Sequence, residues 1–242
     1  MILADIGNTS IHFGIEKNEH LIDTFRLYNK DITLSLLRSK LKKYKFQEII
    51  ACSVAPSISC YFKRLRRKVY FVGKDIIVPV KSLYNKNEIG QDRLVNVFSA
   101  LYFYPQAKII VDFGTAITVD FISKKGAYLG GFIFPGINLY LRSLGRCELL
   151  PDNIKLIECG SSFIPKNTLS SISEGVKEGF PLMVNSFILK YKKILEKKQR
   201  VKKIDIIVTG GESYILQKKL DFPYIYDPLL TLKGLLRLKK II

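Results

Sequence analysis

The stretch IIVDFGTAITVDFI, from Ile109 to Ile122, has two runs of β-branched and aromatic residues on either side of a short Asp-Phe-Gly-Thr break. Runs of this kind favour strands, so the stretch predicts two strands joined by a tight turn. Gly114 permits a positive φ, which lets successive N–H groups face an anion, and Thr115 and Thr118 add hydroxyl donors. Asp112 ends an apolar strand, where a buried carboxylate requires a cation or several donors. The turn can therefore bind phosphate, although an ordinary hairpin capped by an Asp has the same pattern.

A second copy of this pattern lies at the start of the chain, in ILADIGNTSIHFGI from Ile2 to Ile15. An apolar strand again leads to an Asp-x-Gly break, a Thr follows shortly after, and a second apolar strand completes the hairpin. Asp5 and Asp112 lie nearly half the chain apart, and such internal repetition is a signal of fold. We expect two similar α/β halves, residues 1–106 and 107–242, which face each other across a cleft. Both turns would then meet one bound nucleotide, an arrangement that indicates phosphoryl transfer.

The order of the other expected elements indicates mixed sheets with helices on them. After the first hairpin, residue patterns predict a strand at 20–28, a helix at 33–44, a strand at 48–54, a helix opened by Pro56, and short strands at 70–72 and 76–80. After the second hairpin they predict a strand that ends in the Pro135-Gly136 turn, a helix at 137–145, a helix from 168 to about 198 that kinks or restarts at Pro181, a strand at 204–208 and a terminal helix.

Charge favours anionic partners. The formal net charge is +18, from 39 Lys and Arg against 21 Asp and Glu, and much of the excess lies in clusters at 63–68, 190–203 and 239–240. Such clusters usually mark solvated helix faces or termini, and nucleic-acid binding is the alternative. A basic surface would also attract an anionic substrate such as ATP.

Cysteine usage and hydropathy narrow the class of protein. The chain has four cysteines without Cys-x-x-Cys spacing and only two histidines, so neither a zinc site nor a disulfide framework is expected. The first acidic residue, Asp5, leaves no room for the apolar region of a signal peptide, and no window is apolar enough for a membrane span. We therefore expect a soluble cytoplasmic protein with reduced thiols.

A second candidate site follows the polar loop that ends at Gly90. A helix is predicted to begin about Gln91, which places Asp92 and Arg93 in its first turn, where backbone N–H groups lack partners. The helix dipole stabilises an Asp there, whereas an Arg is electrostatically misplaced. A carboxylate that can accept a proton, next to a cation that can hold a carboxylate, suits an acidic substrate that bears a hydroxyl. A purely structural reading of this turn is equally compatible with the spacing.

Two glycine pairs add weaker signals. Gly210 and Gly211 follow a predicted strand and precede a predicted helix, where backbone can lie against a nucleotide. Gly175 and Gly179 share one face of a predicted helix, which permits close packing of another helix or of a second subunit.

Taken together, these motifs resemble the type III pantothenate kinases, which belong to the superfamily of acetate kinase, sugar kinases, Hsc70 and actin and have two ribonuclease-H-like halves. The resemblance extends from the first strand to the last helix. It rests on seven motifs in the right order: DIGNT at Asp5–Thr9, GQDR at Gly90–Arg93, DFGTAIT at Asp112–Thr118, GGFIFPG at Gly130–Gly136, TLSSISEG at Thr168–Gly175, TGG at Thr209–Gly211 and DPLLT at Asp227–Thr231.

The resemblance implies an α/β fold of the actin-like ATPase type and ATP-dependent phosphorylation of pantothenate to 4′-phosphopantothenate, the first step of coenzyme A synthesis. It further implies a cytoplasmic homodimer that requires a monovalent cation, K⁺ or NH₄⁺, and Mg²⁺ with ATP, without membrane or nucleic-acid partners. The residues assigned to ATP are Asp5, Ile6, Gly7, Asn8, Thr9, Ser10, Ile11, His12, Thr115, Gly210 and Gly211. Those assigned to pantothenate are Tyr84, Gly90, Gln91, Asp92, Arg93 and Thr168.

Four residues carry a more specific role by the same resemblance. Asp92 would be the general base on the pantothenate hydroxyl, Asp112 would ligate the monovalent cation, and Asp5 would lie near the divalent cation. Thr168 would reach the substrate of the partner subunit. Chemistry agrees with the first role, because a primary alcohol is too weak an acid to lose its proton at neutral pH unless a base accepts it in the transition state.

Two departures and two alternatives accompany the resemblance. The loop at 85–88 lacks the usual Asn-Pro and is one residue shorter, which leaves the role of Tyr84 open, and Ile117 replaces a Thr common in the second phosphate motif. One alternative is a non-catalytic relative that acts as an accessory factor in transcription and uses its charge to bind nucleic acid. The other is a kinase of the same superfamily with a different small hydroxy acid as substrate.

Overall fold

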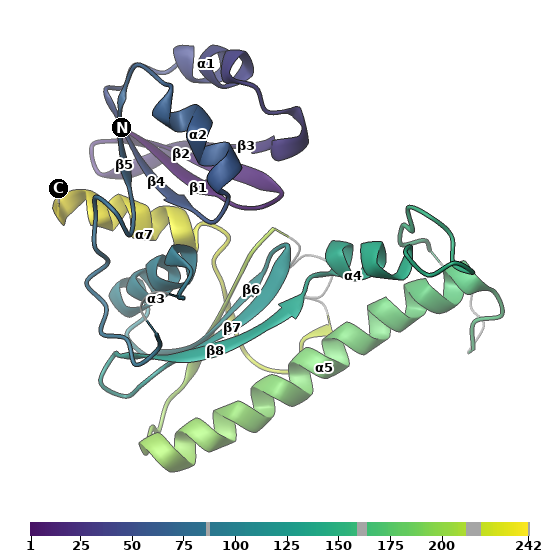
Figure 1. The fold of residues 1–242 in the computed structure, drawn as a ribbon. Coiled ribbons are helices and arrows are strands. Elements are labelled where there is room, and N and C mark those ends of the chain that lie inside the picture. The colour runs from purple at the N-terminus through teal and green to yellow at the C-terminus, as the bar shows by residue number, and fades with distance from the viewer. Residues whose placement is uncertain (86–87, 159–163, 212–218, 242) are drawn as a thin grey trace. The chain divides into compact units, whose positions relative to one another are not determined.

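The computed structural model describes residues 1–85, 88–158, 164–211 and 219–241. The chain divides into two compact units, which Figure 1 shows in full. The first unit comprises Met1–Ala107, Lys125–Gly130 and Leu229–Ile242, and the second comprises Lys108–Lys124 and Gly131–Pro228. The first change of unit lies beside the expected boundary at 106 and 107. The C-terminal segment, which the sequence assigns to the second half, clusters with the first unit.

The sheet of the first unit has five strands in the order β3-β2-β1-β4-β5. Antiparallel pairs join β1 to β2 and β2 to β3, whereas β4 pairs parallel with both β1 and β5. The sheet is therefore mixed, as expected. Its strands are β1 (Ile2–Ile6), β2 (Ser10–Lys17), β3 (His20–Tyr28), β4 (Glu48–Ser53) and β5 (Lys68–Phe71). The strand expected at 76–80 does not form, and Ile76 makes only an isolated bridge with Val72.

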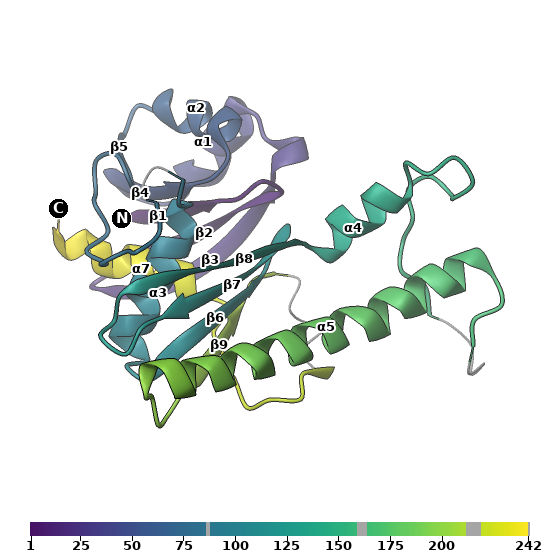
Figure 2. The same cartoon turned by 60° about the horizontal axis from the view of Figure 1, so that its bottom comes forward.

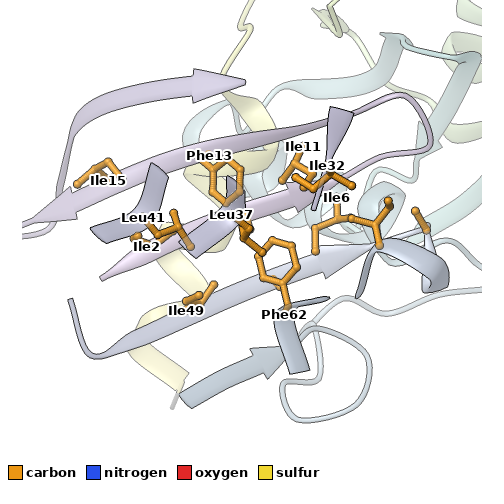
Figure 3. Close-up of a cluster of buried hydrophobic side chains, with 14 residues drawn as sticks. Ile2, Ile6, Ile11, Phe13, Ile15, Ile32, Leu37, Leu41, Ile49 and Phe62 are labelled. Carbon is orange, nitrogen blue, oxygen red and sulfur yellow. The ribbon is translucent and has the colours of Figure 1, made fainter. Parts of the chain in front are cut away.

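Helices cover both faces of this sheet (Figure 1). They are η1 (Asn29–Asp31), α1 (Leu34–Lys42), α2 (Pro56–Lys63), α3 (Gln91–Phe103), α7 (Leu230–Leu238) and η3 (Lys239–Ile241). Because successive side chains of a strand point to opposite faces, Ile2 and Ile6 of β1 pack with α1 and α2, and Figure 3 shows this cluster. Leu3 points the other way and packs with residues of α3 and α7. Asp5 has the same parity as Leu3, so it lies on the α3 side of the sheet.

The second unit has its own five-stranded sheet in the order β10-β9-β6-β7-β8. Its strands are β6 (Ala107–Phe113), β7 (Ala116–Ile122), β8 (Tyr128–Pro135), β9 (Asp205–Thr209) and β10 (Ile225–Tyr226), and its helices are α4 (Ile137–Leu144) and α5 (Thr168–Gln199). The first residue of β6 and the stretch of β8 up to Gly130 cluster with the first unit. Pairing is antiparallel between β6 and β7 and parallel between β9 and β10, so this sheet is mixed as well. The α/β fold expected from the sequence is confirmed.

Helix α5 is the longest element of the second unit and runs along its sheet (Figure 2). The rings of Phe187 and Tyr191 pack against those of Phe121 and Phe132 from β7 and β8. The helix does not restart at Pro181, contrary to one expected outcome, and continues as a single helix through this buried residue. Burial of the apolar stripe on both sides of Pro181 offsets the backbone hydrogen bond that a proline removes. Within the described residues, no helix is both long enough and apolar enough to cross a membrane.

Candidate active site

The turn between β1 and β2 is built around Gly7, whose N–H donates to the carbonyl of Ser10 at 3.0 Å. Asn29 of η1 holds the turn from outside, since its side chain donates to the Gly7 carbonyl at 2.8 Å and its backbone N–H donates to the Thr9 carbonyl at 2.9 Å. Asn8 and Thr9 are exposed at the tip. The first expected phosphate turn therefore forms, with two polar side chains at its surface.

The side chains of the other ATP-assigned residues in this hairpin contribute little to a ligand. Ile6 and Ile11 are fully buried in the core. His12 is buried beside Arg26, whose Nη2 lies 3.1 Å from its Nδ1. Burial, and then the charge of Arg26, lower the pKa of His12 to about 4, so its ring is neutral at pH 7. His12 therefore adds no positive charge, and Ile6 and Ile11 have only backbone groups to offer.

The turn between β6 and β7 has a similar bond, because the N–H of Gly114 donates to the carbonyl of Ala116 at 3.1 Å. Neither Gly114 nor Gly7 has a positive φ, contrary to the reason for glycine expected from the sequence. At Gly7 the glycine supplies space, since a Cβ there would lie 3.2 Å from the Ser10 carbonyl oxygen, whereas a Cβ on Gly114 would make only ordinary contacts, the nearest at 3.4 Å from the Ala116 carbonyl oxygen.

Two further glycines bring other backbone segments against this second turn. Gly210, at the end of β9, has a φ of +96°, and a Cβ there would lie 2.5 Å from Asp112 Oδ1 and from backbone atoms of Phe113. Gly136, after β8, donates its N–H to the Thr115 carbonyl at 3.0 Å, and a Cβ there would collide with that carbonyl. The structure thus joins the DFGT turn, the Gly136 end of the GGFIFPG motif and the TGG motif at one place in the second unit. Gly211 is exposed next to it.

Asp5 and Asp92 both belong to the first unit, and the charge of each reaches the same buried cysteine. Asp5 of β1 pairs in register with Cys52 of β4, which is fully buried. Burial raises the pKa of the Cys52 thiol well above its usual range, and the charges of Asp92 and Asp5 raise it further. The charges of both carboxylates favour the protonated form of this thiol. Cys52 therefore adds no third negative charge near them.

The loop before α3 shapes the position of Asp92. Its Oδ1 accepts a hydrogen bond from the Arg93 N–H at 2.8 Å, so the carboxylate turns back to the start of the helix, where the dipole stabilises it. A Cβ on Gly90 would lie 2.5 Å from the same oxygen, so only glycine leaves this carboxylate in place. Gln91 packs its side chain at Gly73, where a Cβ would lie 2.5 Å from Gln91 Cδ. Asp92 therefore has a structural role at the start of α3. This role is compatible with a catalytic role for the same carboxylate.

Arg93 has an environment that its place at a helix N-terminus does not predict. It is only 5% exposed, and its guanidinium carbon lies 5.8 Å from the ring centroid of Tyr84 and 5.7 Å from that of Tyr128. The negative faces of the two rings stabilise the cation that the helix dipole disfavours. Sequence reasoning missed Tyr128, and the only available signal was an aromatic residue just before the Gly130-Gly131 pair.

Thr168 lies in the second unit, at the first residue of α5, where its side chain is exposed. Asn167 is the N-cap and accepts from the Ser170 N–H at 2.9 Å, so the hydroxyl of Thr168 is not needed to cap the helix.

The carboxylates fit the cations that the resemblance implies. Within the described residues, no group of three or more His, Cys, Asp and Glu side chains could hold a metal by itself. Mg²⁺ bound to a nucleotide usually takes one or two carboxylates and completes its shell with phosphates and water, which Asp5 could provide for. Asp112, whose Oδ1 lies close to Gly210, offers a carboxylate oxygen, the kind of ligand that a hard monovalent cation prefers.

The basic clusters of the sequence lie at helix ends. Residues 63–68 run from the last turn of α2 to the start of β5, Lys197 and Lys198 occupy the last turn of α5, and Lys239 and Lys240 follow α7. Cations are stabilised at helix C-termini by the dipole. The last two also pair with Glu16 and Glu19, at 2.8 and 2.9 Å. The clusters thus have a structural explanation.

Comparison with known proteins identifies the family of this chain. A family model for type III pantothenate kinases matches residues 1–190. The chain belongs to that family. Type III pantothenate kinases from Persephonella marina and Finegoldia magna are 34% and 36% identical to it, and each alignment covers 97% of this chain and 96% or 95% of the relative. This member of the type III pantothenate kinases is accordingly an ATP-dependent kinase.

Solved structures agree on the fold. A Campylobacter jejuni protein described as a Baf family transcriptional activator has a TM-score of 0.61 at 24% identity and covers 100% of this chain and 98% of its own. The ethanolamine utilization protein EutJ from Carboxydothermus hydrogenoformans has a TM-score of 0.56 at 14% identity, with 97% and 88% covered. At these identities the likeness shows the actin-like ATPase fold alone, so the first description carries no role in transcription to this chain.

Proposed function

We propose that this kinase transfers the γ-phosphoryl group of ATP to the primary hydroxyl of pantothenate, with Asp92 as the general base. The observation that carries the proposal is the start of α3, where the carboxylate of Asp92 stands next to the buried Arg93, with Asp5 of β1 on the α3 side of the sheet. One carboxylate can serve the nucleotide's divalent cation while the other accepts the hydroxyl proton late in a loose transition state. The reaction belongs in the cytoplasm, where ATP is supplied.

Phosphate binding is proposed for the turns of both units. In the first turn, the exposed Asn8 and Thr9 would meet the phosphates of ATP, and Asp5 would hold Mg²⁺. In the second, Thr115 contributes from the turn and Gly210 and Gly211 contribute backbone. Mg²⁺ would neutralise charge that develops on the phosphates, and the protein residues hold the phosphates in place.

Asp112 is proposed as the ligand of a monovalent cation, K⁺ or NH₄⁺. The backbone of Gly210 approaches its Oδ1 closely, so this carboxylate oxygen lies at the meeting point of the turn and the end of β9. A cation at this carboxylate would offset the repulsion between Asp112 and a nearby phosphate.

Pantothenate is proposed to bind at the start of α3, with its carboxylate at Arg93 and its hydroxyl at Asp92. Gly90 and Gln91 shape this turn, and Tyr84 lies beside Arg93. A guanidinium holds a carboxylate through paired N–H donors, so Arg93 suits this anionic end of the substrate. This placement also gives Tyr84 a role despite the shortened loop, part of which lies outside the described residues.

A homodimer is proposed, with Thr168 of one subunit at the substrate of the other. The second unit exposes large apolar side chains, including Ile133 at 61% and Leu182 at 62%. No described atom lies within 4 Å of a Cβ on Gly175 or Gly179, so the small-residue face of α5 is open. Exposed apolar side chains and an open helix face of this kind suit contact with a second copy of the chain.

A coupled assay of ADP release tests the proposal. We expect ADP release to depend on pantothenate, to require K⁺ or NH₄⁺, and to be lost in Asp92→Asn although the variant folds. Absence of turnover by the wild-type protein, together with tight and salt-sensitive DNA binding, would overturn the proposal. It would favour the alternative of a non-catalytic relative that acts as an accessory factor in transcription.

A further inference from the structure

Arg93 is the only proposed substrate ligand whose charge opposes its place in a helix, so its side chain needs support from outside α3. It is almost fully buried, and a long buried cation without fixed neighbours would adopt several rotamers. Tyr84 and Tyr128 provide planar faces at 5.8 and 5.7 Å from the guanidinium carbon. These faces limit the directions in which the guanidinium can point.

Tyr128 is the better fixed of the two rings. It is fully buried, and both of its backbone groups are paired with the segment before Tyr84: its N–H donates to the Lys81 carbonyl at 2.8 Å, and its carbonyl accepts from the Leu83 N–H at 2.9 Å. The rings of Tyr84 and Tyr128 lie 6.0 Å apart. Tyr128 therefore positions the backbone that leads into Tyr84 as well as the cation itself.

Gly130 completes the arrangement. Its φ is +110°, and a Cβ there would lie 3.2 Å from Tyr84 Cδ2. All of these residues belong to the first unit, in its segments Met1–Ala107 and Lys125–Gly130. The support for Arg93 thus comes from a chain segment distant in sequence, in which no residue is assigned to the substrate.

We propose that Tyr128 is a positioning residue that holds Arg93 in the orientation needed to bind the substrate carboxylate, and that it thereby determines selectivity for an acidic substrate. The inference rests on the proposed function, because it takes the carboxylate of pantothenate as the partner of Arg93. Tyr128 contacts Arg93 and need not touch the substrate. Its loss should weaken binding of the carboxylate and leave the phosphoryl transfer step intact.

The test compares pantothenate with pantothenyl alcohol, in which a hydroxymethyl group replaces the carboxylate and the reacting hydroxyl is unchanged. In Tyr128→Leu, we expect the KM for pantothenate to rise about tenfold, the loss typical of one weakened charged contact, with kcat nearly unchanged. The KM for pantothenyl alcohol should stay the same. Tyr128→Phe keeps the ring and should restore the wild-type KM for pantothenate.

A matched control is Tyr102→Leu. The ring of Tyr102, on the same helix as Arg93, lies under a different cation, Arg237, at 3.9 Å from its guanidinium carbon. Removing that ring takes away a cation–π pair of the same unit without touching Arg93, so both KM values should stay at their wild-type levels. If Tyr128→Leu does not fold, Tyr128→Met answers the same question, because a flexible side chain can refill the buried site.

Three results would overturn the inference: an unchanged KM for pantothenate in Tyr128→Leu, an equal rise of KM for both substrates, or the same loss in Tyr128→Phe. Failure of the proposed function would look different, because the wild-type protein itself would then not phosphorylate pantothenate.

Discussion

The two Asp-x-Gly turns begin alike in sequence and end in different surroundings. In the first, Ile6 pairs with Ile11, which leaves residues 7–10 in the turn, whereas in the second Phe113 pairs with Ile117 and leaves 114–116. The second turn is shorter by one residue, so the cross-strand neighbour of Asp5 is His12 and that of Asp112 is Thr118.

The surroundings also separate the two aspartates. The first turn has exposed side chains at its tip. The charges of its Asp5 and of Asp92 both raise the pKa of the buried Cys52 thiol. The second turn packs against the backbone of Gly136 and Gly210, and its Asp112 lies close to Gly210. A repeated motif can therefore supply two functions, because the packing around each copy decides which groups its carboxylate meets.

The proposed function assigns the proton transfer to Asp92 of the first unit, so the largest effect should follow from removing this base. Asp92→Asn should lower kcat by roughly 10²- to 10⁴-fold, the usual contribution of a general base. The KM for ATP should change little, because the turns that bind phosphate are untouched. Steady-state kinetics on protein with a wild-type thermal transition would measure this, and a kcat within threefold of wild type would contradict the assignment.

His12, the cross-strand neighbour of Asp5, should make the free energy of unfolding depend on pH. Thr118, the neighbour of Asp112, has no titratable group and should not. The pKa of His12 is about 4 in the folded protein and 6.5 without the fold, so the unfolded chain binds the extra proton between these values. The contribution of His12 to the free energy of unfolding is complete above pH 6.5. It falls as the pH drops towards 4, by about 3 kcal/mol in total.

The variant that tests this is His12→Thr, which copies the second turn. Urea unfolding at pH 7.5, 5.5 and 4.5 should show a smaller loss of stability for the variant than for the wild type as the pH falls. Parallel pH profiles for the two proteins would mean that His12 titrates normally in the folded state.

The carboxylate of the second turn should control the response to the monovalent cation. In Asp112→Asn, we expect activity to fall roughly 10- to 100-fold, the loss of one charged interaction of about 1.5–3 kcal/mol, and the remaining activity to be insensitive to K⁺. Asp5→Asn is the matched variant, and it should alter the Mg²⁺ requirement while K⁺ still activates. A K⁺ titration that is unchanged in Asp112→Asn would place the cation elsewhere.

The smallest effect should separate the glycines of the two turns. Gly210→Ala forces a positive φ on alanine and a Cβ within 2.5 Å of Asp112, so it should cost about 1–3 kcal/mol of stability. Gly7→Ala has neither problem to the same degree, since its Cβ would lie 3.2 Å from one carbonyl oxygen, and it should cost less than Gly210→Ala. Urea midpoints of the two variants measure the difference, and an equal cost would remove this distinction between the turns.

Local patterns in the sequence determined a large part of this protein. Runs of β-branched and aromatic residues and a three- or four-residue break specify each hairpin, because strand propensity and turn chemistry act over a few neighbouring residues. The start of α3 at Gln91 follows from the same kind of local signal, and so does the pairing of Asp92 with Arg93 in its first turn. The repeated Asp-x-Gly motif and the family resemblance also came from sequence order alone.

Only the tertiary structure decided which distant groups meet. The terminal helix α7 buries Leu232 and Leu235 with Leu3 and Val95 in the first unit, although its place in the sequence assigns it to the second half. Tyr128 lies against Arg93, and Gly210 lies against Asp112, because sheet pairing and helix packing close long loops between them. Hydrophobic burial rewards such contacts without regard to distance along the chain, so no local spacing records them.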